Sequence, residues 1–595
     1  MSNLATRESL DAGDLLAGYA RAPGRHDELV DANGEVRAHW AKFLGSLAEL
    51  TPDEVAGRAR RLDKRVHQIG IAYDIFADPN TPRQRWTVDL VPLIIGAAEW
   101  RWLERALTQR ARLFQAVLAD IYGPQNLLRD GHIPPSLVFS DPAYIRACHG
   151  IPHPGGHLQF YAADLARNCD GTWRVIDSHT ETPAGVGSAL ANRVAHTHVA
   201  GDMFKAANGR RIASFFQDMQ ASIAEHCQRS NPRIALLTTG PHHEDYFSHA
   251  YLARYLGYLL VEGNDLRSIG DRIYLKTLEG LKEIDALVRC TEGHASDPLE
   301  LDPAGFAGPV GLVEVVRQSP GIVVNAIGSA IVQNRGLGSY LPALSRHLLG
   351  EDLLLPDTPR RWLGLGASAT QCLFEDVGDI EKMVVRKAQE GIGRPGRAAL
   401  GTHVASLEAA ERATAMAEIN LMRDHLVAEA PASFGTTPSL SADATRLEPA
   451  AFALRLFVTR TTDGFALMPG GLAMSIDPSR ALGLSAPEGR TRDVWVTADR
   501  DVPAHTSLWR PTVEQAQVER SQRVTQSRAA DDLYWLGRYA ERADWTMRVL
   551  RSALQRQQED GLPVEGQAAA RRCLEVLLSD KPLAVPPRRD LADNA

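Results

Sequence analysis

The sequence is poor in cysteine and has no long hydrophobic run. Its six cysteines, at positions 148, 169, 227, 290, 372 and 573, form no Cys-x-x-Cys pair and no repeated spacing. This pattern excludes a disulfide framework and a zinc site of the usual spacing, and it fits a reducing cytoplasm. The longest apolar runs, such as residues 90–98, are much shorter than a membrane span, and the N-terminus lacks the pattern of a signal peptide. We therefore expect a soluble cytoplasmic protein.

The chain also lacks an excess of basic residues. It has 65 Lys and Arg against 73 Asp and Glu, which gives a net charge of -8. General binding to nucleic acid or to an anionic membrane needs a basic surface, so neither is expected. Small anions remain possible ligands, because a local arginine cluster can bind them on an acidic protein. The length of 595 residues suggests about three or four domains.

One stretch, residues 161–185, contains a candidate metal site. Two strand-like segments flank the turn Asp170-Gly171, with Asp164 near the start of the first and Asp177 near the end of the second. Strands joined by a tight turn can bring both carboxylates to one end of a sheet. Mg²⁺ usually takes one or two protein carboxylates and completes its shell with water and substrate phosphates. The stretch is thus either a magnesium-nucleotide site or an ordinary hairpin with two solvated acids.

The patterns along the chain predict a mixed α/β (α+β) protein with five regions. Residues 1–30 are polar, and we expect them to be loosely ordered and flexible. Residues 31–230 are mainly helical and contain the hairpin, with helices expected again from about residue 201 to 226. Strands alternate with helices in residues 231–360, which predicts a parallel, Rossmann-like domain. A smaller α+β region follows at 370–510. After a polar linker over 513–526, residues 525–595 begin with a strongly amphipathic helix.

Read in order, several motifs resemble the circularly permuted ATP-grasp family with a shortened α-E domain at the C-terminus. The resemblance covers roughly residues 30–550, and its motifs are YGPQ (122–125), QFYAADLAR (159–167), GP (240–241), AYLARYLG (250–257), DPLEL (297–301), MPGGLA (468–473), DVWV (493–496) and LYWLGRY (533–539). The last of these resembles the opening of an α-E domain. The remaining helical segment is too short for an independent α-E domain.

The order of the motifs is the order that a circular permutation would give. In an unpermuted ATP-grasp chain a phosphate-binding Lys comes first, followed by an acidic hinge, an Arg-bearing strand pair and finally the metal-binding strands. Here Lys387, Glu429 and Arg455 follow the Asp164/Asp177 segment. The resemblance therefore implies that residues 31–230 contain the C-terminal half of the ATP-grasp fold and that 370–510 contain its N-terminal half. Residues 231–360 would be the pre-ATP-grasp domain.

The resemblance also implies the cofactors, ATP and Mg²⁺, and a set of site residues. Asp164 and Asp177 would be metal ligands. His179 stands where unpermuted relatives have Asn, so Asn192 either supplies a third ligand or only caps a turn. The other implied residues are Arg386 or Lys387 for phosphate, Glu429 for the adenine and ribose, Arg193 and Arg455 for phosphate or an acyl phosphate, and Arg289 for the acceptor substrate. Each arginine has a structural ion pair as its alternative.

Three functions are compatible with this resemblance. The first is a ligase that joins a carboxylate to an amine through an acyl phosphate, acting on small molecules or peptides. The second is a catalytically degenerate scaffold that binds a protein partner through its C-terminal helix. The third is a nucleotide sensor that ligates nothing. Met474 and Ala428 stand where the family pattern has Arg and Gln, and these departures favour the second function.

Overall fold

The computed structural model describes residues 16, 18–70, 86–243, 245–364, 383–389, 408–476, 490–502, 525–558, 566, 568–569 and 571–572. The chain divides into two units. The first consists of Met1–Leu275 and Lys282–Gln517, and the second of Lys276–Leu281 and Val518–Ala595. The linker expected over 513–526 lies almost entirely outside the described residues. The finer domain boundaries given by the sequence stay predictions.

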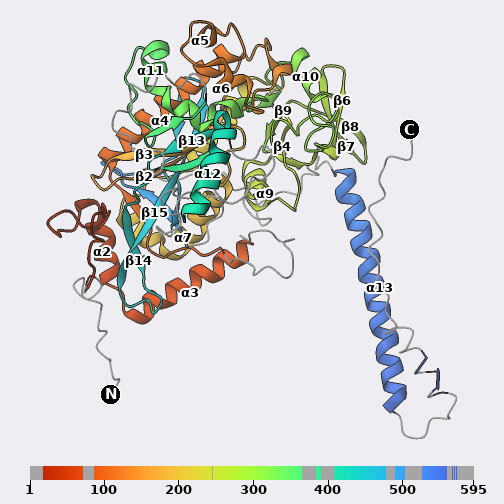
Figure 1. Cartoon of the computed structure of the whole chain (residues 1–595). Helices are drawn as coiled ribbons and strands as arrows, with labels where there is room; N and C mark the ends of the chain where they lie inside the picture. Colours follow the sequence, from red (N-terminus) through yellow and green to blue (C-terminus); the bar gives the residue numbers. More distant parts are fainter. Residues whose placement is uncertain are drawn as a thin grey trace, which may run out of the picture. The chain divides into compact units, whose positions relative to one another are not determined.

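The first unit contains an eight-stranded sheet in the order β1-β18-β17-β15-β2-β3, with β14 and β16 also paired to β15 (Figure 1). Its strands are β1 (Leu93–Ile95), β2 (Phe160–Arg167), β3 (Trp173–His179), β14 (Thr436–Leu440), β15 (Leu447–Thr461), β16 (Gly464–Leu467), β17 (Leu472–Ser475) and β18 (Thr491–Val496). The β1–β18 pair is parallel, and the other strand pairs of this sheet are antiparallel. Strand β2 therefore pairs with a strand that lies almost 300 residues further along the chain, as a permuted fold requires, and β3 continues the sheet beside β2.

Helices cover both faces of this sheet. Because side chains alternate along a strand, Phe160 and Ala162 share one face and Tyr161 lies on the other. Phe160 and Ala162 belong to a core that also includes residues of α3 (Pro52–Ile69), α7 (Val186–Ala206) and α8 (Ala213–Glu225). On the opposite face, the ring of Tyr161 meets Phe114 of α4 (Ala97–Ile121) edge-on, with centroids 5.4 Å apart. The large sheet is thus held rigidly between two layers of helices.

A second sheet in the same unit is fully parallel, as the alternating pattern over 231–360 predicts. Its order is β10 (Val323–Val324), β9 (Ala286–Arg289), β4 (Ile234–Leu237) and β5 (Leu259–Val261). Helix α9 (Tyr246–Leu256) joins β4 to β5 and ends at Gly257, whose φ of 73° is the left-handed conformation that glycine adopts most easily. The Rossmann-like arrangement of strands is therefore confirmed.

A third, antiparallel sheet has the order β11 (Arg360–Trp362), β13 (Leu426–Glu429) and β12 (Val384–Lys387). One of its faces is apolar, since Val385 and Ala428 form a small core with Ile419 of α12 (Ala409–Leu421). By strand alternation, Arg386 and Glu429 lie on the other face. Because the apolar face of this small sheet packs on its own core, the charged side chains of the other face point toward the neighbouring large sheet.

The remaining elements complete the two units. They are α2 (Ala41–Ala48), α5 (Asn126–Arg129), α6 (Pro135–Phe139), α10 (Leu312–Gln318), α11 (Leu341–Leu349), α13 (Ser527–Gln558), β6 (Leu266–Ile269), β7 (Arg272–Thr277), β8 (Gly280–Ile284), and the 3-10 turns η1 (Ala38–Trp40), η2 (Arg146–Cys148), η3 (Gly263–Asp265), η4 (Ser329–Gln333), η5 (Arg335–Ser339) and η10 (Arg423–His425). Loose order was expected for all of residues 1–30, but Glu28 donates its backbone N–H to Thr436 and Leu29 is fully buried. In the described part of the chain, no helix combines the length and hydropathy that crossing a bilayer requires.

Candidate active site

Three charged residues stand in one row across the large sheet. Asp164 on β2 lies directly opposite Arg455 on β15 and directly opposite Asp177 on β3. Residues paired in register point to the same face of a sheet, so the two carboxylates and the guanidinium share one face. The predicted hairpin is confirmed, and its two acids are neighbours. Both are buried, with Asp164 1% and Asp177 9% exposed, so they are not the solvated acids of an ordinary hairpin.

Asp164 is neutralised within its own sheet. Arg455 donates to both of its carboxylate oxygens, at 2.7 and 2.8 Å, and His179 Nε2 lies 2.8 Å from Oδ2. Burial by itself would raise the pKa of Asp164, but the charges of Arg455 and His179 outweigh burial and lower the pKa to about 2. The carboxylate is therefore ionised at neutral pH and held by a bidentate fork.

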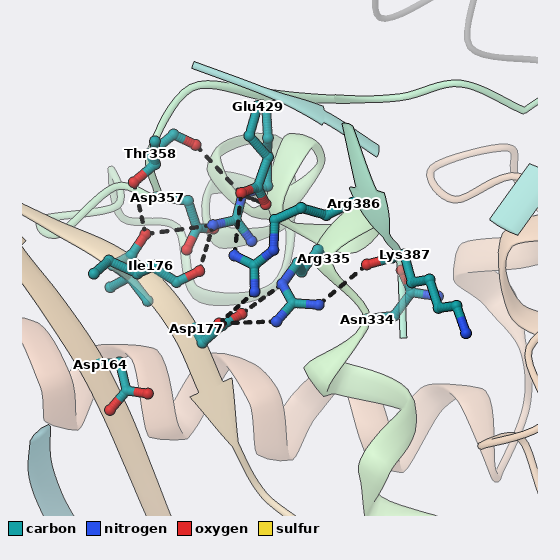
Figure 2. Close-up of polar contacts among 12 residues, drawn as sticks. Asp164, Ile176, Asp177, Asn334, Arg335, Asp357, Thr358, Arg386, Lys387 and Glu429 are labelled. Carbon is teal, nitrogen blue, oxygen red and sulfur yellow. Dashed lines mark hydrogen bonds and ion pairs between the residues drawn. The ribbon is translucent and has the colours of Figure 1, made fainter. Parts of the chain in front are cut away.

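Asp177 is neutralised from outside the large sheet. Arg335, at the start of η5, donates to its two oxygens at 2.6 and 2.8 Å, and Arg386 of β12 donates at 3.3 Å. Figure 2 shows both guanidinium groups directed at this one carboxylate. Burial would raise the pKa of Asp177, but Arg335 and Arg386 hold it well below its usual value. Both members of the pair are thus anionic oxygen donors.

The charged face of the small sheet continues the cluster. Arg386 and Arg360 flank Glu429, at 3.4 and 3.5 Å from its oxygens, and Arg360 also donates to the backbone carbonyl of Ile176 at 2.6 Å. Glu429 is 1% exposed, and its Oε1 accepts no hydrogen bond from the described residues. The Arg360 ion pair at 3.5 Å neutralises this oxygen, but it leaves room for one hydrogen-bond donor from a ligand. The hydroxyl groups of a ribose are suitable donors.

Of the two candidate phosphate contacts on β12, the structure directs Arg386 into the cluster. Lys387 is the next residue of the strand, so its side chain leaves the opposite face, and Figure 2 shows it directed away from Asp177. Its backbone carbonyl accepts from Arg335 at 3.1 Å. Lys387 therefore helps to hold Arg335, whereas Arg386 reaches the carboxylate.

Arg289 lies beside the cluster, in a fully buried position at the end of β9. It donates to Glu181 at 3.2 Å and to the backbone carbonyls of Thr291 and Ala326. Glu181 follows β3 and also accepts from the backbone of Gly293 at 2.7 Å. Arg289 thus connects the parallel sheet to the loop that follows the hairpin of β2 and β3. This contact is the structural ion pair that the sequence left as an alternative.

Asn192 and Arg193 are not brought to the carboxylate pair. The Asn192 amide accepts from Trp86 Nε1 at 3.0 Å and donates to Thr491 Oγ1 at 3.2 Å, inside the core. Arg193 is paired with Asp493 at 2.7 Å. Both side chains come from the interior of α7, which packs on the large sheet near β18, and these contacts give no support to their expected roles as metal ligand and phosphate contact.

Sequence reasoning missed two arginines of the cluster, Arg335 and Arg360. Arg335 precedes Gly336 in a turn whose backbone is fixed by Asn334, which accepts from Gly336 N at 2.8 Å and donates to Asp141 at 2.6 Å. Arg335 lies 158 residues from Asp177, and Arg360 lies 184 residues from Ile176. No local pattern marks such partners, and the folded chain alone brings them together.

The residues present fit Mg²⁺ and ATP. Among the described residues no group of three or more His, Cys, Asp and Glu side chains is arranged to hold a metal ion. The pair of ionised, buried carboxylates is nevertheless the donor set that Mg²⁺ uses when phosphates and water complete its shell. Arg335, Arg386 and Arg455 are basic groups of the kind that triphosphate oxygens require, and Glu429 Oε1 is buried with an ion pair to Arg360 but no hydrogen bond among the described residues. A large sheet that carries two buried carboxylates, faced by the charged side of a small antiparallel sheet, is compatible with an ATP-grasp fold.

Comparison with known families assigns the chain. The circularly permuted ATP-grasp type 2 family matches residues 92–475, which is more than half of the chain, and the chain belongs to this family. A second family, described as a predicted alpha-helical domain with a conserved ER motif and named Alpha-E, matches residues 526–590 and includes α13. The resemblance inferred from the motifs is therefore confirmed for both parts.

Two mycobacterial proteins, each named only as an uncharacterized protein, are similar to this chain. Protein Rv2567 of Mycobacterium tuberculosis is 32% identical over 577 residues, covering 92% of this chain and 63% of its own length. Protein Rv2411c of the same species is 30% identical over 495 residues, covering 81% and 86%. The chain thus spans less than two thirds of the first of these relatives. A solved glutathione synthetase-like effector from Globodera pallida aligns with a TM-score of 0.46 and 11% identity, over 76% of this chain and 97% of the effector.

Proposed function

We propose that this protein is an ATP- and Mg²⁺-dependent ligase that joins a carboxylate to an amine. The observation that supports the proposal is the row formed by Arg455, Asp164 and Asp177, faced by Arg386 and Glu429 of the small sheet. The substrates would be small molecules or peptides, because the site is a buried cluster between two sheets. A polymer or a membrane surface would need a broad basic face instead.

Each charged side chain of the site would have a separate role in the reaction. Asp164 and Asp177 would hold Mg²⁺, which supplies charge neutralisation on the phosphates. Arg335, Arg386 and Arg455 would exchange their carboxylate partners for phosphate oxygens and stabilise the charge that develops during phosphoryl transfer. The γ-phosphoryl group of ATP passes to the substrate carboxylate, giving an acyl phosphate and ADP. The amine nitrogen would then bond to the acyl carbon, the carbon–oxygen bond to phosphate would break, and the amine proton would pass to the departing phosphate.

Neighbouring residues of β12 provide a matched test of ATP binding. Arg386→Gln removes a cation from the cluster, and we expect at least tenfold weaker Mg-ATP binding by isothermal titration calorimetry. Lys387→Gln removes a cation that points away from it, and we expect less than a threefold change. Circular dichroism should show both variants folded. Equal losses in the two variants, or no binding by the wild type at millimolar Mg-ATP, would overturn the assignment of the nucleotide site.

Ligase activity needs a separate readout. Libraries of amines and carboxylates are incubated with Mg-ATP, and ADP, phosphate and coupled product are measured by mass spectrometry. The proposal expects ADP and product in equal amounts, and both absent with Asp177→Asn. Nucleotide binding without any product from the library would favour the nucleotide sensor.

A second candidate, the degenerate scaffold, is favoured by His179. This residue stands where unpermuted relatives have Asn, and it contacts Asp164. The scaffold would bind its partner through α13, on which Trp535 and Trp545 are 45% and 66% exposed. His179→Asn restores the amide. The scaffold predicts that the wild type binds no detectable Mg-ATP and that this variant binds it at least tenfold more tightly. Unchanged affinity would support the ligase.

The proposal places the protein in the cytoplasm, where ATP and Mg²⁺ are available. The four cysteines within the described residues, Cys148, Cys169, Cys227 and Cys290, are all free thiols. Free thiols are typical of a reducing compartment. Cell fractionation with an antibody to the native chain tests this location.

A further inference from the structure

A cavity of about 570 Å³ lies between α3, α7, α9 and the segment that leads into α8. We call it the arginine cavity, and its described lining residues are Arg65, Gln68, Ile69, Leu190, Arg193, Val194, Thr197, Phe204, Arg211, Ile212, Ala213, Tyr251, Arg254 and Tyr255. None of these belongs to the cluster around Asp164 and Asp177. Its volume falls in the range of small-molecule sites, which is about 300–1,000 Å³.

The charge of this cavity is of one sign. Its described lining includes four arginines and no Asp or Glu. Arg193 is paired with Asp493, which lies outside the lining. Arg65 comes from α3, and its Nε is buried without an acceptor among the described residues. A cavity whose lining carries several guanidinium groups and no carboxylate has a positive potential that attracts anions.

The rest of the lining is aromatic and apolar. Phe204 has two guanidinium groups near its ring, with Arg193 5.1 Å and Arg211 5.9 Å from the ring centre. Tyr251 is buried, and burial raises its pKa to about 12 although Arg65 and Arg254 act in the opposite direction. Arg65 of α3 and Arg254 of α9 are therefore close enough to the Tyr251 hydroxyl to affect its pKa. Charged and apolar groups are intermixed along one wall.

We propose that the arginine cavity binds a small organic phosphate, a phosphate monoester attached to an aromatic group. Planar guanidinium forks match phosphate oxygens, and a phosphate monoester brings close to two negative charges where a carboxylate brings one. The aromatic part would contact Phe204, Tyr251 and Tyr255. This site is separate from the carboxylate pair and does not depend on the proposed ligase activity.

Calorimetry with 1-naphthyl phosphate tests the proposal on the full chain. Inorganic phosphate and 1-naphthol are the two comparison ligands, because each has one half of the probe. We expect the probe to bind at least tenfold more tightly than either. Arg65→Gln and Arg211→Gln should each weaken probe binding about tenfold, since each removes a charged hydrogen-bond donor. Arg61→Gln, on the exposed side of the same helix α3, is the matched control and should leave binding unchanged.

Each other outcome overturns the proposal. No saturable heat, equal loss in Arg61→Gln, or phosphate binding as tightly as the probe would show that the cavity does not recognise an aromatic phosphate. Loss of probe binding in Arg386→Gln, or competition by Mg-ATP, would place the probe in the carboxylate cluster instead. Retained binding in Arg386→Gln together with loss in Arg65→Gln is the result we expect.

Discussion

The two carboxylates of the site are neighbours in one sheet, yet they are neutralised in different ways. Asp164 pairs with Arg455 and His179, which come from the same large sheet. Asp177 pairs with Arg335 and Arg386, which come from a turn and from the small sheet. The first pairing lies within one rigid layer, and the second joins separate parts of the fold. Asp177 is therefore both a candidate metal ligand and a structural connection.

This difference shows how the small sheet is positioned. Its apolar face packs under α12, and its charged face meets the large sheet through Arg386, Glu429 and Arg360. Arg360 also donates to the β3 backbone at Ile176. A charged ligand can replace the ionic contacts between the two sheets more easily than it could replace apolar packing. These contacts can therefore open without unfolding either sheet. Nucleotide entry would use this property.

The largest effect is expected from Asp177→Asn. This change keeps the shape of the side chain but removes the carboxylate that Arg335 bonds through two nitrogens and one of the two carboxylates that pair with Arg386. Breaking a buried ion pair from one side costs about 3–5 kcal/mol, which urea unfolding can measure. Hydrogen exchange should accelerate in β12 and β13. Asp130→Asn, at an exposed pair with Arg129, should change stability by less than about 0.5 kcal/mol. A loss this small in Asp177→Asn would contradict its connecting role.

Much of the fold could be predicted because its signals are local. The Asp170-Gly171 turn marks β2 and β3, and the alternating apolar runs after residue 231 mark the parallel sheet. Thr51 and Glu54 form a capping box that begins α3, with Pro52 in its first turn. These features depend on residues a few positions apart. The order of the motifs then predicted that strands from the two halves of the chain would share one sheet.

The site was only partly predictable, because its contacts are distant in sequence. Asp164, Asp177 and Arg455 were found from strand patterns and motif order. Asn192 was expected beside them because it follows the hairpin closely in sequence. A residue at this position can reach the two carboxylates only if the chain turns back directly after β3. Instead α7 begins at Val186 and carries Asn192 about two turns along the helix into the core.

The second largest effect is expected from Asp164→Asn. It removes the charged carboxylate that Arg455 bonds through two nitrogens, but Arg455 keeps its hydrogen bond to the carbonyl of Ala184 at 3.2 Å. We expect a loss of about 2–3 kcal/mol in urea unfolding, less than for Asp177→Asn. Hydrogen exchange in β12 and β13 should stay at the wild-type rate, because no pairing of Asp164 reaches the small sheet within the described residues. Faster exchange there would remove the distinction between the two carboxylates.

A smaller effect is expected from Arg335→Lys. The change keeps the charge but removes the planar fork that bonds both oxygens of Asp177 and the carbonyl of Lys387. We expect a loss of about 1–2 kcal/mol in urea unfolding, from the missing charged hydrogen bonds. Arg346→Lys is the control, because its pair with Asp352 is exposed, with side chains 66% and 86% accessible. Equal effects at the two positions would show that the fork geometry at Asp177 contributes nothing.

The smallest effect is a pH dependence that belongs to Asp164. Its pKa is lowered from 3.8 to about 2 in the folded state, so its stabilising contribution is complete above the unfolded pKa and is lost as pH falls toward the folded one. The stability difference between the wild type and Asp164→Asn should be constant above pH 5 and smaller by about 1 kcal/mol at pH 3. Groups that titrate in both proteins cancel in this difference. A gap that stays constant or widens on acidification would mean that Arg455 and His179 do not lower the pKa of this carboxyl.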